Sequence, residues 1–500
     1  MNLEFCILGL NLDSFPLWVA ILPEVILVAS AIAVILLDLF VQRKGILAIV
    51  SIIGIVLSAF FSATLWNFSL TYFNGMLALD SFAVFFKLLF LVIAALVILA
   101  STDYVPKFAR FRGEYYALVL LSALGMMLMA ATTELISIYI ALELTSISLY
   151  VLVGFLKDPK STEASLKYLL LGALASAVLL YGMALVFGVT GRTQLGEIAQ
   201  AVQAMSIENI FANPALILGI VLLLAGFGFK IAAVPFHMWV PDVYEGAPTP
   251  ITAYLSVGSK AAGFAVILRV FYSAFGLPEW LSLNWGLVFA VLAAIGMTLG
   301  NVTALPQTNI KRMLGYSSIA QAGYLMVGLA TMGASPSADV LGRSGILFFL
   351  AGYTVANLGA FTAIIAISNK LDSDLIQDYS GMLKRAPLLA LALTLCLISL
   401  IGMPPAAGFM AKFYIFSGAV QHGLLWLVII AVINSVISAY YYLRVVKMMW
   451  FGEPASEEKV PSSGALRLAL SLSCLGVLLL GIVPNYIMKL AEMAARMFVF

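Results

Sequence analysis

Charged residues are scarce in this sequence. Only 10% of its 500 residues are Asp, Glu, Lys or Arg, against about a quarter in an average soluble domain, while 63% are hydrophobic. Too few polar side chains remain to cover a water-soluble protein of this size. The composition therefore excludes a soluble enzyme and a disordered chain. The net charge of +2 also argues against a nucleic-acid partner. We predict an integral membrane protein.

Cysteine and histidine are scarce as well. Cys6, Cys396 and Cys474 are scattered along the chain, and the last two lie in apolar runs, so no disulfide framework or metal cluster is predicted. His237 and His422 do not form the pair that a membrane haem needs. No glycine-rich phosphate loop opens a strand–helix unit. We therefore expect no redox cofactor and no metal in this chain.

Long apolar runs dominate what is present. A membrane-spanning helix needs ~20 mostly apolar residues. The chain has about fourteen such runs, which predicts an all-α protein with one polytopic membrane domain over residues 1–500. The first run carries Glu24 and lacks a basic start, so we interpret it as a helix and not as a signal peptide. The predicted spans lie near 16–39, 46–66, 79–100, 115–132, 134–155, 166–189, 214–235, 250–275, 284–304, 312–331, 344–368, 387–417, 424–446 and 465–489.

Basic residues alternate between the loops. Every second loop is rich in Lys and Arg, beginning with the loop after the first span, and this alternation supports the number of spans. Basic loops usually face the cytoplasm, which places both termini on the opposite side. The basic residues are Arg43, Lys44, Lys107, Arg110, Arg112, Lys157, Lys160, Lys167, Lys311, Arg312, Lys370, Lys384, Arg385, Arg444, Lys447, Lys459 and Arg467.

Four lysines lie within the predicted spans, away from the basic loops, and Glu143 lies in the middle of a span; the lysines are Lys87, Lys230, Lys260 and Lys412. An ionisable group at the bilayer centre costs at least ~2.5–3.5 kcal/mol, so it usually faces a partner or a wet cavity. Burial disfavours the charged form of an amine, and a nearby carboxylate favours it. We therefore expect Glu143 and the last three lysines to exchange protons. A snorkelling or structurally paired lysine explains Lys87 equally well.

Lys230 stands beside predicted helix breakers. Gly226 and Gly228 precede Lys230, and Pro235 follows it. Proline lacks a backbone donor and clashes with the carbonyl four residues earlier, here that of Ile231. We predict a broken helix at this point.

A second break precedes Lys412. Pro404 and Pro405 free the carbonyls of Leu400 and Ile401. Carbonyls left unpaired at membrane depth are tolerated only where protein or water satisfies them. A break beside an intramembrane lysine occurs twice, which indicates a functional arrangement.

The order of the spans indicates an internal repeat. Spans four to eight, at about 115–275, and spans nine to thirteen, at about 284–446, each have the broken helix as fourth member. Because five is odd, the second copy enters the membrane inverted, as in secondary transporters. Lys230 and Lys412 are then expected in half-channels that open to opposite sides, with Lys260 between them.

A short polar segment follows the first break. His237, Asp242 and Glu245 lie within it. These residues are candidates for proton uptake at the mouth of a half-channel. A packed, proline-rich turn with capping carboxylates explains the same residues.

Several segments resemble one known family. The chain is similar to the antiporter-like membrane subunits of respiratory complex I and its ferredoxin-dependent relatives, specifically the N subunit. The resemblance covers the fourth to the thirteenth span. The matching stretches are EASLKYLLLGALASAVLLYG, KIAAVPFHMWVPDVYEGAPTPITAYLSVGSKAAGF, GNVTALPQTNIKRMLGYSSIAQAGYL, GMPPAAGFMAKFYIF and YYYLRVVKMMW.

The resemblance implies roles for individual residues. Glu143 and Lys230 fall on the pair that switches proton affinity in the family. Lys260 falls on the central relay lysine, and Lys412 on the lysine that leads protons to the positive side. Gln321 stands where many members carry histidine, and a glutamine can orient water but cannot carry the proton itself.

The resemblance also implies an assembly and a reaction. We expect a proton-translocating subunit of an NADH-quinone oxidoreductase in the cell (inner) membrane, or in a thylakoid membrane as the alternative. Its expected partners are other membrane subunits, lipids, the quinone used by the complex, and a peripheral redox arm that holds flavin and iron–sulfur clusters. A multisubunit cation/proton antiporter is one rival interpretation. A structural scaffold whose buried charges only fix helix packing is another.

Overall fold

The computed structural model describes residues 17–108, 111–205, 214–275, 279–331, 340–454, 456 and 458–496. Cys6 and Arg110 lie outside these residues. The described chain is almost entirely helical, apart from a hairpin of β1 (Leu70–Tyr72) and β2 (Leu77–Leu79). Within these residues, twelve helices are long and apolar enough to cross a membrane. The predicted class, an all-α membrane protein, is confirmed.

The helices follow the predicted apolar runs closely. Their bounds are α1 Leu17–Ala20, α2 Leu22–Phe40, α3 Gly45–Thr64, α4 Ser81–Ser101, α5 Arg112–Ala131, α6 Leu135–Val153, α7 Pro159–Thr190, α8 Leu195–Gln203, α10 Pro214–Ile231, α11 Val240–Gly246, α12 Thr249–Tyr254, α13 Lys260–Ser273, α14 Glu279–Ala304, α15 Ile310–Ala330, α16 Val340–Leu371, α17 Met382–Arg385, α18 Pro387–Ile401, α19 Ala407–Gln421, α20 Leu425–Phe451, α21 Gly464–Ile482 and α22 Asn485–Arg496.

Polar caps define where several helices begin. Asp80, Glu134, Asp158, Asn309 and Ser463 each accept a hydrogen bond from a backbone N–H of the first turn that follows. The first N–H groups of a helix have no partner inside the helix, and such side chains satisfy them. The long apolar stretches between the caps satisfy their own backbone groups, as the membrane interior requires.

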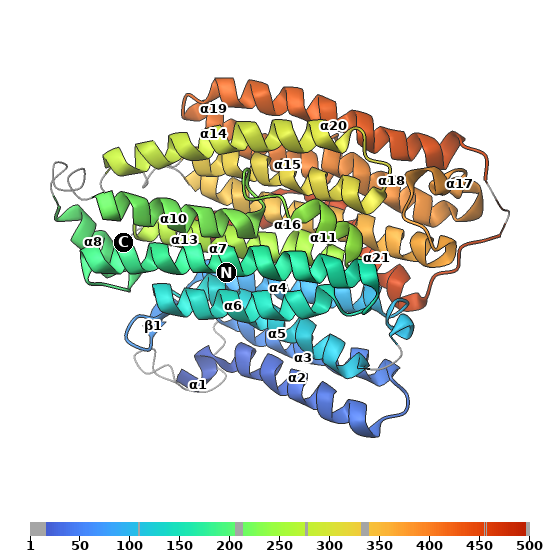
Figure 1. Ribbon diagram of the computed structural model, residues 1–500, viewed down its shortest axis with the longest axis horizontal. Helices are drawn as coiled ribbons and strands as arrows, with labels where there is room; N and C mark the ends of the chain where they lie inside the picture. Colours follow the sequence, from blue (N-terminus) through green and yellow to red (C-terminus); the bar gives the residue numbers. More distant parts are fainter. Residues whose placement is uncertain are drawn as a thin grey trace.

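The long helices lie side by side as a bundle (Figure 1). The short helix α8 lies at one end of the bundle and α17 at the other, so the loops gather at two opposite ends. The segment Thr249–Ser273 is buried throughout and α16 is nearly so, whereas most of α2 is exposed. The interior of the bundle is therefore built around α12, α13 and α16.

The two predicted helix breaks are present. Helix α10 ends at Ile231, and the chain resumes as α11 at Val240; helix α18 ends at Ile401, and α19 begins at Ala407. The predicted span 387–417 is therefore two short helices. The last predicted span, 465–489, is likewise interrupted, between α21 and α22.

A third irregularity was not predicted. Residues Leu255–Ser259 form a π-helical turn between α12 and α13, directly before Lys260. Such turns insert one extra residue into a helix and are frequent at functional sites. Neither a proline nor a glycine pair marks this turn, so residue patterns alone give little sign of it.

Candidate functional site

Lys230 and Glu143 each bond to a serine of the same cavity but do not form an ion pair with each other. Lys230 lies at the end of α10, and its Nζ donates to Ser146 Oγ on α6 at 2.8 Å. Glu143, also on α6, accepts a hydrogen bond from Ser176 Oγ on α7. Ser146, Ser176 and Lys230 line a small cavity between the three helices. Two serines thus separate the amine from the carboxylate.

The burial of the two charged groups differs. Lys230 is buried, whereas Glu143 is only partly buried at the surface formed by α6 and α7. The carboxylate is therefore open to a neighbour outside this chain. Serine hydroxyls both donate and accept hydrogen bonds, so they connect the two groups without neutralising either.

Lys260 lies at the centre of the bundle. It is the first residue of α13, and its Nζ donates to the backbone carbonyl and to Oγ of Ser318 on α15, the latter at 2.7 Å. The amine also lies 5.6 Å from the centre of the Tyr353 ring on α16. Both lysine and serine are buried. A buried amine with hydroxyl and aromatic neighbours is a group from which a proton can leave without breaking a strong ion pair.

Lys412 lies on α19, just after the second break. Its Nζ donates to the Ile401 carbonyl at 2.8 Å and to Ser435 Oγ on α20 at 2.9 Å. The amine also lies 4.2 Å from the centre of the Tyr324 ring, a cation–π contact. Protein groups satisfy both carbonyls that the second break frees, because Gln321 Nε2 donates to the other one, on Leu400, at 3.0 Å.

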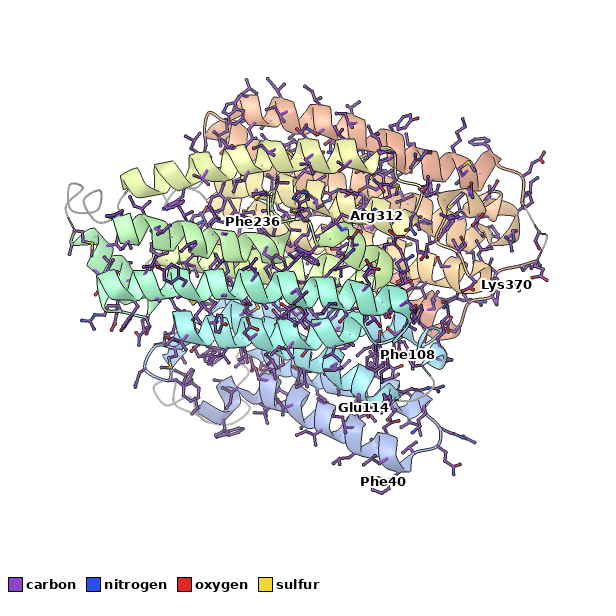
Figure 2. The ribbon with its side chains drawn as sticks, viewed as in Figure 1. Phe40, Phe108, Glu114, Phe236, Arg312 and Lys370 are labelled. Carbon is purple, nitrogen blue, oxygen red and sulfur yellow. The ribbon has the colours of Figure 1, made fainter. Side chains whose placement is uncertain are left out.

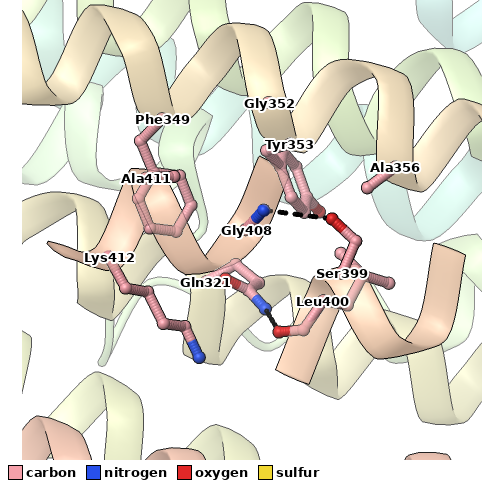
Figure 3. Close-up of a pocket in the computed structure, with 10 residues that line it drawn as sticks. All are labelled: Gln321, Phe349, Gly352, Tyr353, Ala356, Ser399, Leu400, Gly408, Ala411 and Lys412. Carbon is pink, nitrogen blue, oxygen red and sulfur yellow. Dashed lines mark hydrogen bonds between the residues drawn. The ribbon is translucent and has the colours of Figure 1, made fainter. Parts of the chain in front are cut away.

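A second small cavity lies beside Lys412 (Figure 3). Gln321, Tyr353 and Ser399 are its other polar lining residues. Each of the two broken helices therefore has a buried lysine and a polar cavity at its break. The polar groups that line each cavity can bind water, which needs two to four hydrogen-bonding partners.

The carboxylates of α11 are held in a cluster of charges. Asp242 binds Lys167 at 2.8 Å and Arg312 at 2.7 Å, and Glu245 binds Arg312 and Lys160, each at 3.2 Å. All five side chains are at least partly exposed. Figure 2 shows Arg312 displaced toward the end of the bundle that carries Lys370.

His237 is the third candidate for proton uptake in this segment. His237 precedes α11 and lies in the break segment 232–239, half-buried beside the exposed Phe236. Within the described residues it makes no ion pair with either carboxylate. Figure 2 places Phe236 nearer the middle of the bundle than Arg312.

Two further buried ion pairs lie outside the line of lysines. Lys87 on α4 binds Glu24 on α2 at 2.7 Å, so Lys87 is a paired lysine. Arg269 on α13 binds Asp80 with two hydrogen bonds, of 2.6 and 3.1 Å, and donates twice to the Ala130 carbonyl. Sequence reasoning missed this second pair, because Asp80 stands at the start of the predicted span 79–100 and Arg269 near the end of the predicted span 250–275, where charges are common.

The described residues offer no group of three or more His, Cys, Asp or Glu side chains that could hold a metal ion. Cys396 and Cys474 are free thiols, the first buried and the second partly so. The chemistry that the described site supports is proton exchange at amines, a carboxylate and hydroxyls.

Buried amines beside two broken helices, inside a bundle of spanning helices, define an antiporter-like membrane protein. The family described as NADH:quinone oxidoreductase/Mrp antiporter, transmembrane, matches residues 132–438, more than half of the chain. The chain belongs to this family. The matched region includes Glu143 and the three unpaired intramembrane lysines, and it excludes Glu24 and Lys87.

Curated relatives make the relationship more specific. The chain is 53% identical over 482 residues to NADH-quinone oxidoreductase subunit N of Dehalococcoides mccartyi, covering 96% of this chain and 99% of the relative. It is 48% identical over 485 residues to the subunit of the same name from Trichlorobacter lovleyi, covering 95% and 96%. The predicted resemblance to this subunit is confirmed.

Solved structures agree with this relationship. A chain of respiratory complex I from Thermus thermophilus is 33% identical with a TM-score of 0.79, over 94% of this chain and 99% of that one. A chain of an archaeal membrane-bound sulfane sulfur reductase is 28% identical with a TM-score of 0.84, over 96% and 98%. A chain of the Mrp complex from Dietzia, at 20% identity and a TM-score of 0.82 over 96% and 97%, shares the fold.

Proposed function

We propose that this chain is the proton-translocating, antiporter-like N subunit of an NADH-quinone oxidoreductase. The observation that carries the proposal is that Lys230, Lys260 and Lys412 are buried amines whose hydrogen-bond acceptors are hydroxyls and carbonyls. An amine bonded to neutral acceptors can give up its proton at a smaller cost than one locked in an ion pair. Its relatives at about 50% identity carry the subunit N name.

Each ionisable group has a proposed role. Glu143 and Lys230 form the pair in which a change at the carboxylate alters the proton affinity of the amine across the serine-lined cavity. Lys260 is the central relay, and Lys412 passes protons toward the opposite side. Gln321 orients groups at the second break. Asp242 and Glu245 guide protons toward the first half-channel, and His237 exchanges protons at the break itself.

The architecture that we propose has fourteen spans and two inverted repeats. In this scheme α10 with α11, and α18 with α19, are the broken fourth members of repeats at about 115–275 and 284–446. The half-channels at Lys230 and Lys412 then open to opposite sides. The whole chain, residues 1–500, forms one polytopic membrane domain. Both termini lie on the non-cytoplasmic side of the cell (inner) membrane, as the alternation of basic loops favours.

The proposed partners follow from the same function. Other membrane subunits flank this chain, and the partly exposed Glu143 is the group open to such a neighbour. A peripheral arm with flavin and iron–sulfur clusters oxidises NADH and reduces quinone. This chain holds no cofactor in our proposal, so the redox step drives it through conformational and electrostatic changes.

The intact complex, reconstituted in lipid vesicles, provides the test. We expect Lys230→Ala and Glu143→Ala to lower NADH-driven proton pumping by roughly tenfold or more while the complex still assembles, because each variant removes a proton-exchanging group. Lys459→Ala, at an exposed loop lysine, is the matched control and should pump normally. Normal pumping by both Lys230→Ala and Glu143→Ala would refute the proposal.

The fold by itself does not distinguish our proposal from a cation/proton antiporter, because the Mrp chain shares the architecture at 20% identity. The two functions differ in what drives transport. An antiporter exchanges Na⁺ for protons in vesicles without NADH, whereas a complex I subunit pumps only during quinone reduction. Genes for other complex I membrane subunits beside this one would favour our proposal.

A further inference from the structure

Gln321 is committed to a structural task. Its Nε2 donates to the Leu400 carbonyl, which the break between α18 and α19 leaves without a helical partner. A carboxamide neither gains nor loses a proton near neutral pH. Gln321 therefore stabilises the broken helix, and another group has to connect Lys260 with Lys412.

A chain of hydroxyls leads away from Lys260. The amine donates to Ser318 Oγ at 2.7 Å, and the Tyr353 hydroxyl donates to the same oxygen at 3.2 Å. The Tyr353 hydroxyl in turn accepts a hydrogen bond from Asn357 Nδ2 at 3.2 Å, which holds it in place. All of these side chains are buried. A hydroxyl is both donor and acceptor, so it can receive a proton on one side and release one on the other.

Asn357 also links this hydroxyl to the irregular helix. Its Nδ2 donates to Ser256 Oγ at 2.6 Å, and Ser256 lies in the π-turn that directly precedes Lys260. The same amide therefore positions the Tyr353 hydroxyl and one residue of the turn that places Lys260. This shared partner gives the π-turn a role in aligning amine and hydroxyl.

Tyr353 also borders the cavity of Lys412 (Figure 3). The cavity is lined by both side chains, together with Ser399 and Gln321. The centre of a water molecule can occupy about 10 Å³ of this space, close to the ~10–15 Å³ that one water needs, so the cavity has room for about one water beside the polar lining groups. Tyr353 thus lies against the Lys260 amine and shares the lining of this cavity with Lys412.

We propose that Tyr353, acting with Ser318, is the relay through which a proton passes from Lys260 to Lys412. The inference rests on the proposed function. In the transfer, Lys260 releases a proton to Ser318 Oγ, the serine proton moves to the Tyr353 oxygen, and the tyrosine proton passes through cavity water to the Lys412 amine. Both hydroxyls rotate before the transfer. Only O–H and N–H bonds change, and one positive charge moves between the lysines.

The test is Tyr353→Phe in the intact complex in vesicles, because phenylalanine keeps the ring and loses only the hydroxyl. We expect NADH-driven pumping to fall about tenfold or more in an assembled complex. The matched control is Tyr244→Phe, which removes a hydroxyl that also lies 3.2 Å from Ser318 Oγ but does not line the cavity. Its pumping should stay normal.

A second variant separates a relay from a structural role. Gln321→His, added to Tyr353→Phe, introduces into the same cavity a group that exchanges protons near neutral pH. We expect it to restore part of the pumping and to make the pumping rate depend on pH around the histidine titration. Pumping by Tyr353→Phe equal to that of Tyr244→Phe, or a low rate that the histidine leaves unchanged, would overturn the relay.

Failure of the Tyr353 relay can be distinguished from failure of the proposed function. If Lys230→Ala and Lys412→Ala lose pumping while Tyr353→Phe pumps normally, the relay alone is wrong. If both lysine variants pump normally, the function itself is wrong.

Discussion

The buried pair of Asp80 and Arg269 allows a quantitative prediction about stability. The two side chains are 10% and 2% exposed and share two short hydrogen bonds, and Asp80 also caps α4 through the Ala83 N–H at 2.7 Å. Removing one partner of a buried ion pair costs about 3–5 kcal/mol, and losing an N-cap costs about 1 kcal/mol. Asp80→Ala should therefore lower the free energy of unfolding by about 4–6 kcal/mol, a large part of the ~5–15 kcal/mol typical of folded proteins.

Equilibrium unfolding of the purified chain in mixed detergent micelles would measure this free energy. Two further variants separate the contribution of the ion pair from that of the helix cap. Asp80→Asn keeps an oxygen that can cap α4 and loses only the charge, so it should cost less than Asp80→Ala. The double variant Asp80→Ala/Arg269→Met removes both charges and should recover most of the loss, because an apolar replacement of a buried pair is often neutral. A loss below about 1 kcal/mol in Asp80→Ala would show that the pair behaves like an exposed one and would refute the reasoning.

Substitutions at two other buried lysines should affect different properties: proton pumping at Lys260 and stability at Lys87. Lys260→Ala should lower quinone reductase turnover as well as proton pumping, since the two processes are coupled; a full reductase rate in this variant would contradict the coupling. Lys87→Met should destabilise the chain by about 3–5 kcal/mol, because it leaves Glu24 buried without its cation. The double variant Lys87→Met/Glu24→Leu should regain stability and pump protons normally, and a pumping defect would place this pair in the proton path.

Local chemistry made part of the site predictable. Pro235 and the Pro404–Pro405 pair act on backbone groups at most four residues away, so both helix breaks could be located without tertiary information. Lys230 and Lys412 stood out for a similar reason, because a charge inside an apolar run has few structural explanations. The same argument left Lys87 undecided, and only its contact with Glu24 explained it.

The partners of the buried cations could not be predicted from local sequence patterns. Ser318 is 58 positions from Lys260, and Asp80 is 189 positions from Arg269. Serine and aspartate are common in loops and helix ends, so nothing in their local pattern marks them as partners of a buried cation. His237 is close in sequence to Asp242, but among the described residues it joins none of the ion pairs that hold this carboxylate.

Apolar runs, prolines and isolated charges determined the membrane class of this protein, most helix bounds and the location of its amines, because each acts through its immediate neighbours along the chain. Helix packing alone decided which amines are paired with carboxylates and which face hydroxyls and cavities. Lys87 and Lys260 are both buried lysines within apolar helices, yet one meets Glu24 and the other Ser318. Whether a buried amine holds its proton or passes it on depends on such contacts, which form only between residues far apart in the sequence.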